Sequence, residues 1–123
     1  MQFIPEKFAA SYIIRSYEDG EILINETRYR QHLILTTDKL ITDWQPGPFA
    51  DVTREQLAPL LALDIDVLLI GTGEHQQFLS PALMTDFIRQ GIGIEVMNTA
   101  AACRTFNVLV GEGRRVAAGL FVE

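Results

Sequence analysis

Short hydrophobic runs alternate with turn-forming residues along the first 44 positions of the chain. Glu18-Asp19-Gly20, Asn25-Glu26 and Asp38-Lys39 separate runs that are rich in β-branched and aromatic residues. Runs of this length between such turns are typical of a β-meander or of paired hairpins. We therefore expect strands over residues 11–17, 21–24, 27–37 and 40–44.

The pattern changes after the proline-glycine loop that follows residue 44, where apolar residues begin to recur at helical spacing. Thr53 to Gln56 form a capping box that starts one helix, and Pro59 inside this helix should kink or shorten it. Ser80-Pro81 is an N-cap followed by proline at the first helical position, and Asn98 or Thr99 caps the last helix. Apolar strands alternate with these helices, over residues 66–71, 93–97 and 115–122.

This alternation of helices and apolar strands predicts an α/β sheet covered by helices. The chain of 123 residues fits one domain, residues 1–123, without an internal repeat or linker. Hydrophobic residues make up 48% of the chain, and a domain of this size can bury an adequate core without disulfides. The prediction is therefore a single α/β domain that begins with β-hairpins.

Charge and cysteine content narrow the class of partner and compartment. The net charge is -6, and Arg114-Arg115 is the one adjacent basic pair, so nucleic acid is not expected as a partner. Cys103 is the only cysteine, which excludes an internal disulfide and suits a reducing compartment. The first eleven residues match neither a secretory signal nor a transit peptide, and no run of about 20 apolar residues could span a membrane. These features predict a cytoplasmic protein.

Gly71-Thr72-Gly73 follows an apolar strand, as the glycines of a dinucleotide-binding loop do. Glu95 lies near the end of the next strand, where dinucleotide-binding folds often have an acidic residue that binds the ribose. Gln76, however, stands where the third glycine should be, and Glu74 would place a negative charge beside a phosphate. The next helix begins only at Ser80, too far along the chain for its amides to share a phosphate with the glycine loop. We interpret the loop as a tight turn at a strand end, with a ligand pocket beside it as the alternative.

Other candidate chemistry is sparse. His32, His75 and Cys103 have no spacing typical of metal ligands, so no metal and no cofactor are predicted. Cys103 could be a nucleophile if a histidine lay close, but a lone cysteine in an alanine-rich helix is more often a core residue. Asn107 shares a helical face with Cys103 and apolar residues. One interpretation is that its side chain forms hydrogen bonds with the backbone of an adjoining strand or loop. The other is that Asn98, Arg104 and Asn107 line a polar pocket. Arg104 lies off this helical face and is expected to point to solvent or to pair with an acid.

With these residues in place, the chain resembles a family of small domains of unknown function that includes the mitochondrial complex I assembly factor of this type and an adipogenesis-associated protein. The resemblance covers nearly the whole chain and includes LLIGTG, Trp44 before the proline-glycine loop, and GIGIEVMNTAAACRTFNVLVGEGRRVAAGLF. Its most specific positions are Met97-Asn98-Thr99, Ala102, Phe106-Asn107, Leu109, Glu112 and Arg114. Asn25-Glu26-Thr27 departs from it, because relatives usually have glycine in this hairpin.

The resemblance implies a single layered domain with a mixed central sheet, flanking helices and an extra N-terminal β-hairpin layer. It also implies that the last strand runs antiparallel to its neighbours. It carries no established catalytic residues, and its clearest eukaryotic role is to help a membrane complex assemble through protein contacts.

Two functional hypotheses follow, and a third, self-association through an exposed strand edge, is compatible with either of them. The first is a non-catalytic interaction or assembly module with a protein partner, in an oligomeric state that the sequence does not define. The second is a small-molecule-binding protein or enzyme with a pocket at the strand ends. The residues expected to line that pocket are Gly71, Thr72, Gly73, Glu95, Asn98, Thr99 and Asn107. No catalytic residue is assigned.

Overall fold

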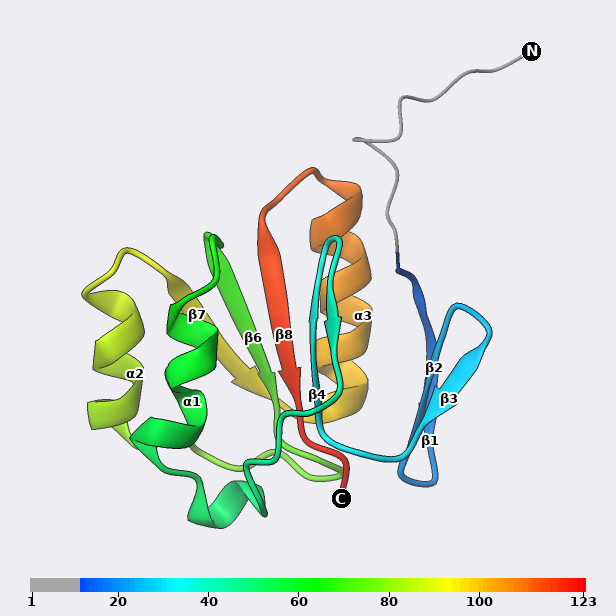
Figure 1. The fold of residues 1–123 in the computed structure, drawn as a ribbon, viewed down its shortest axis with the longest axis horizontal. Helices are drawn as coiled ribbons and strands as arrows, with labels where there is room; N and C mark the ends of the chain where they lie inside the picture. The colour runs from blue at the N-terminus through cyan, green and yellow to red at the C-terminus, as the bar shows by residue number, and fades with distance from the viewer. Residues whose placement is uncertain (1–11) are drawn as a thin grey trace.

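The computed structural model describes residues 12–123, which form two sheets and three α-helices (Figure 1). The first sheet is an antiparallel meander in the order β1-β2-β3. The second has the order β5-β4-β8-β6-β7 and mixes parallel with antiparallel pairs. The strands are β1 (Ile14–Glu18), β2 (Glu21–Ile24), β3 (Thr27–Tyr29), β4 (Leu33–Thr36), β5 (Leu40–Ile41), β6 (Val67–Gly71), β7 (Gly93–Met97) and β8 (Val116–Leu120). The predicted mixed sheet with an N-terminal hairpin layer is thus confirmed.

The three helices begin where their capping residues predict. In α1 (Arg54–Leu61), the Thr53 side chain and Gln56 form both bonds of the capping box, and the helix with its internal proline is only eight residues long. Ser80 caps α2 (Pro81–Ile88), which has proline at its first position. Asn98, one of the two predicted alternatives, caps α3 (Thr99–Gly111) by accepting from Ala101 N–H. A short 3-10 helix, η2 (Phe49–Asp51), lies in the loop before α1 and was not predicted.

The strand region predicted over residues 27–37 is two strands in two different sheets. Residues up to Tyr29 complete the hairpin layer as β3, and residues from Leu33 enter the main sheet as β4. His32 lies between them, with its Nδ1 accepting from Val122 N–H at 2.9 Å. The first residue of the predicted strand over 11–17 lies outside the described residues; the strand β1 runs from Ile14 and includes Glu18.

The last strand, β8, lies in the middle of the main sheet and joins its two halves. It is antiparallel to β4, pairing Leu33 with Leu120, and parallel to β6, pairing Val67 with Val116. The implication that it runs antiparallel to its neighbours is therefore wrong for β6. The physical reason is that β8 follows β7 through α3, a crossover connection that places it parallel to β7 and therefore to β6.

Small residues in β8 let other elements approach the sheet closely. A Cβ atom on Gly119 would lie 3.3 Å from both Leu60 Cδ1 and Trp44 Cη2. The face that carries α1 and α2 buries Ile34, Leu68, Ile70, Phe87 and Phe121 among others. This packing makes β8 the fully buried centre of the domain.

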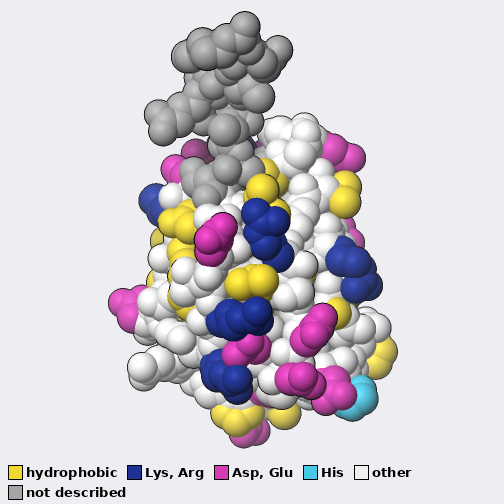
Figure 2. All heavy atoms as spheres, turned by 90° about the vertical axis from the view of Figure 1, so that its right-hand side faces the viewer, with side chains coloured by type: hydrophobic (Ala, Val, Ile, Leu, Met, Phe, Trp, Pro, Cys, Tyr) yellow, Lys and Arg dark blue, Asp and Glu magenta, His cyan; other side chains and the backbone are white. Residues whose placement is uncertain are grey.

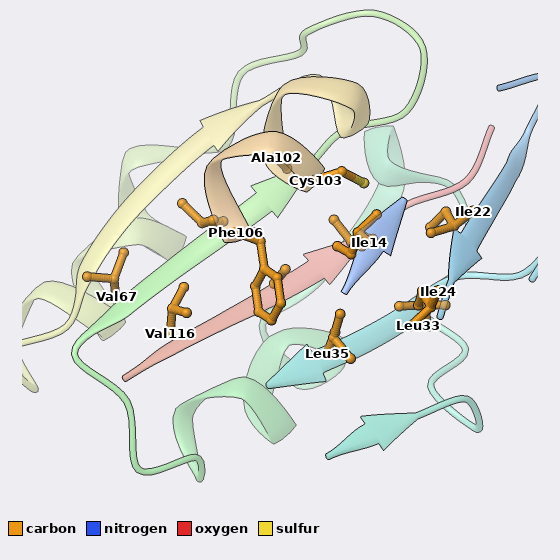
Figure 3. Close-up of a cluster of buried hydrophobic side chains, with 13 residues drawn as sticks. Ile14, Ile22, Ile24, Leu33, Leu35, Val67, Ala102, Cys103, Phe106 and Val116 are labelled. Carbon is orange, nitrogen blue, oxygen red and sulfur yellow. The ribbon is translucent and has the colours of Figure 1, made fainter. Parts of the chain in front are cut away.

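On the opposite face, α3 lies between the main sheet and the hairpin layer. Its Ala102, Cys103 and Phe106 meet Val67 and Val116 of the main sheet, and the hairpin strands contribute Ile14, Ile22 and Ile24 (Figure 3). The hairpin layer is therefore part of the hydrophobic core. Its outer face is charged: in Figure 2, basic and acidic side chains interleave across this side of the molecule, and hydrophobic side chains show only as separate patches.

Candidate functional site

Gly71, Thr72 and Gly73 lie at the carboxyl end of β6, as predicted, and all three are buried. Thr72 N–H donates to Met97 C=O at 2.9 Å. The Thr72 hydroxyl donates to His75 C=O at 2.6 Å and accepts from Gln77 N–H at 3.1 Å. The threonine therefore organises the loop that leads to α2, and both hydrogen-bonding capacities of its hydroxyl serve that loop.

Thr99 joins three segments at this strand end. Its hydroxyl donates to Phe121 C=O at 2.6 Å and accepts from Gly73 N–H at 2.8 Å, and its own N–H donates to Gly73 C=O at 2.9 Å. Thr99 is completely buried, and its hydroxyl both donates and accepts a hydrogen bond within the protein. The start of α3 is thereby fixed to the ends of β6 and β8.

Glycine is required at positions 71 and 73 for two different structural reasons. A Cβ atom on Gly71 would lie 2.8 Å from Thr99 Oγ1 and 2.9 Å from Thr99 Cα, so the residue must be small to admit the helix start. Gly73 has φ of +102°, a conformation that favours glycine. Both glycines thus support the interpretation of a structural turn.

Asn98 and Glu95 also belong to the set of residues predicted to line a strand-end pocket, and their surroundings differ. The Asn98 side chain accepts from Ala101 N–H at 2.8 Å and caps α3. Glu95 is exposed on β7, opposite Leu69 of β6, and forms no ion pair within residues 12–123. An anion at the start of α3 would compete with the bonds that Gly73 and Asn98 already make to the helix amides.

Asn107 lies away from the strand end and holds the hairpin layer to α3. Its Nδ2 donates to Ile14 C=O at 2.6 Å, and its Oδ1 accepts from Ile14 N–H at 3.1 Å. The backbone of Ile14 is therefore paired by one side chain 93 residues away. This is the first of the two predicted interpretations, an amide that bonds an adjoining strand.

Cys103 is a core residue, and Arg104 next to it is exposed. Burial raises the pKa of the Cys103 thiol to about 12, which keeps it protonated near neutral pH and removes its nucleophilic character. Within the described part of the chain, no three His, Cys, Asp or Glu side chains lie together where they could hold a metal ion.

A shallow cleft of about 320 Å³ was missed by the sequence analysis. Its lining comes from Arg30, Gln31, His32, Thr42, Trp44, Gln45, Gly47 and Val122. Because His32 Nδ1 accepts a backbone N–H, the neutral ring carries its proton on Nε2, and burial lowers the pKa of His32. No sequence signal could have found this cleft, because its wall forms only when the end of β8 meets the segment before β4.

The fold is that of a small α/β domain with a mixed sheet and a separate hairpin layer, and in this chain Thr72, Asn98 and Thr99 near the glycine turn bond internally. The model of the family "Protein of unknown function (DUF498/DUF598)" matches residues 14–121, and the chain belongs to this family.

Relatives and solved structures agree with this assignment. A crystal structure of a Bordetella parapertussis protein has a TM-score of 0.85 at 33% identity, covering 94% of this chain and 98% of that one. An NMR structure of a Xanthomonas campestris protein has a TM-score of 0.83 at 37% identity, covering 99% and 92%. The NADH dehydrogenase (ubiquinone) 1 alpha subcomplex assembly factor 3 of Xenopus tropicalis is 33% identical over 115 residues, which are 84% of this chain and 63% of the factor.

The chain thus spans less than two thirds of the length of this assembly factor. Within residues 12–123, none of the helices has the length and apolar character needed to cross a membrane.

Proposed function

We propose that this domain is a non-catalytic protein-interaction module of the assembly-factor type. The observation that carries the proposal is the internal use of the polar groups at the strand end. The hydroxyls of Thr72 and Thr99 and the side chains of Asn98 and Asn107 all bond the protein's own backbone. Groups that are already paired inside a fold are unavailable to convergent ligand binding unless that fold opens.

The names of some relatives, though not of all, support a role in assembly. Several relatives are named as assembly factors of NADH dehydrogenase, and an assembly factor acts through contacts with other proteins. Two of them are 33% and 28% identical to this chain. Neither the fold nor these names identify the partner of this chain. The proposal therefore concerns the mode of action, protein contact, and leaves the partner to experiment.

Tagged protein purified from its native cells at near-physiological salt tests this function. The proposal expects a second protein in a constant molar ratio that survives gel filtration. If the protein elutes alone and a panel of metabolites raises its melting temperature, the pocket hypothesis replaces this one, because ligands that bind the native state stabilise it. Fractionation of the same cells would test the cytoplasmic location, which remains a prediction.

A further inference from the structure

The outer edge of β7 is open and regular. Gly93 N–H donates to Asp66 C=O, and Met97 C=O accepts from Thr72 N–H, so these residues direct their backbone groups toward β6. Successive residues of a strand direct these groups to opposite sides. The N–H and C=O groups of Ile94 and Val96 therefore point outward, where no strand of residues 12–123 pairs with them. Of these groups, Val96 C=O accepts a long hydrogen bond from the Gln76 side chain, at 3.4 Å.

The other sheet edges carry features that oppose pairing. β1 has an irregular register between Ile14 and Ser16, and Asn107 already bonds the Ile14 backbone. β3 has three residues and carries Arg28, and β5 has two residues. β7 has five consecutive pairs with β6 and contains no proline. Natural proteins usually protect such an edge, so a long regular one invites strand addition.

Exposed apolar side chains lie near both ends of this edge. The loop that carries Phe78 reaches the end of β7, because Gln76 Nε2 donates to Val96 C=O at 3.4 Å. Phe78 is 92% exposed although Thr72 holds its loop in place. At the start of β7, Ile88 is 59% exposed and its C=O accepts from Gly91 N–H. Rigidly presented aromatic residues are typical anchors of protein interfaces.

The negative charge of Glu95, at the centre of the edge, favours a basic partner strand over a second copy of this chain. A second copy pairing antiparallel with its Ile94 opposite Val96 would place Glu95 directly opposite its own copy. Like charges at directly opposed positions destabilise a sheet, and both copies carry a net charge of -6. A strand with Lys or Arg opposite Glu95 would instead gain a favourable cross-strand pair.

We propose that the outer edge of β7 binds an extended segment of a partner protein as an added strand, with a basic residue opposite Glu95 and apolar residues toward Phe78 and Ile88. This proposal rests on the proposed interaction function and names the surface and the chemistry of the partner. The added strand would pair with both outward backbone groups of Ile94 and with Val96 N–H, and it would replace the Gln76 side chain as the partner of Val96 C=O.

Blocked seven-residue peptides of alternating Val and Lys, or Val and Glu, are the probes. Each is titrated into ¹⁵N-labelled protein. The Val-Lys peptide should shift the amide resonances of Ile94 and Val96 and slow their hydrogen exchange. An N-methylated Val-Lys peptide should lose binding, because its backbone donors are blocked. Perturbation of another edge, or none at Ile94 and Val96 up to the solubility limit, would overturn the proposal.

Two charge reversals provide the matched comparison. Glu95→Lys should weaken the Val-Lys peptide about fivefold to tenfold and favour the Val-Glu peptide. Glu26→Lys makes the same change in net charge at an exposed turn of the hairpin layer and should alter affinity less than twofold. Phe78→Ala should also weaken binding without loss of stability, since this side chain is almost fully exposed. Equal effects of the two Lys variants would refute a specific role of Glu95.

The same variants test the edge proposal separately from the proposed protein-interaction function. If tagged wild-type protein retains a stoichiometric partner and Glu95→Lys and Phe78→Ala retain it equally, the edge proposal fails and the interaction function stands. If wild-type protein retains none, the interaction function itself fails. A dimer of this chain in sedimentation, dispersed by Glu95→Lys or by peptide, would also overturn the proposal by making a second copy the occupant.

Discussion

Replacing Asn107 tests how the hairpin layer is held to the rest of the domain. Asn107→Ala removes two hydrogen bonds, of 2.6 and 3.1 Å, and leaves both backbone groups of Ile14 without their partner. Ile14 is only 4% exposed, so water replaces these bonds poorly. An unpaired buried polar group costs about 1–3 kcal/mol, and partial access of water lowers the sum for two groups to about 2–4 kcal/mol of unfolding free energy.

Urea denaturation measures this loss, and hydrogen exchange locates it. The exchange of amides in β1 and β2 should accelerate more than that of β6 and β8, because the hairpin layer loses its fixed contact with α3. Asn107→Asp keeps the acceptor for Ile14 N–H but places a carboxylate oxygen against Ile14 C=O, so it should also destabilise. Val108→Ala, at the neighbouring exposed position, is the control. Stability of Asn107→Ala within about 0.5 kcal/mol of wild type would refute the reasoning.

Three further predictions concern the core and the strand end. Gly71→Ala should lower the free energy of unfolding, measured in urea, by about 1–3 kcal/mol, since its Cβ would meet the start of α3. The control Gly111→Ala has open space around its Cβ and should be neutral or slightly stabilising. Equal effects of the two variants would count against the close approach at Gly71. Cys103 should react with iodoacetamide only at the rate of unfolding, because burial raises its pKa to about 12, and rapid labelling of native protein would contradict its place in the core. His32 has a lowered pKa in the folded state, so the unfolded chain takes up its proton first and stability should fall as pH drops below about 6.5, through the folded pKa. His32→Asn keeps an acceptor for Val122 N–H and should lose this part of the dependence between pH 7.5 and 5; an unchanged profile would exclude His32 as its source.

Local signals predicted the elements of this domain well. The capping box at Thr53, the Ser80-Pro81 start and the Asn98 cap each fix a helix through bonds within a few residues, so the sequence contains all the information that these starts require. The division of residues 27–37 between two sheets has a distant cause. Leu33 enters the main sheet because it pairs with Leu120, and no pattern within the segment records that partner.

The strand-end site shows the same division between local and distant information. The sequence placed Gly71 to Gly73 correctly at the end of an apolar strand. It could not show that the Thr99 hydroxyl bridges Gly73 and Phe121, because these three residues come from separate parts of the chain. The helical spacing allows Asn107 to be a structural amide, but it does not identify Ile14 as the partner, because the two residues are 93 positions apart. The open edge of β7 likewise depended on sheet order, which periodicity does not give.

Native mass spectrometry of the protein purified from its own cells most directly distinguishes protein contact from small-molecule binding. If the domain acts through protein contact, the spectrum should show a complex whose mass equals this chain plus a second protein, and collisional activation should release the two chains without a small adduct. A lone chain that carries a noncovalent small molecule of constant mass would contradict protein contact. It would instead indicate that the strand end, or the cleft beside His32, binds a ligand.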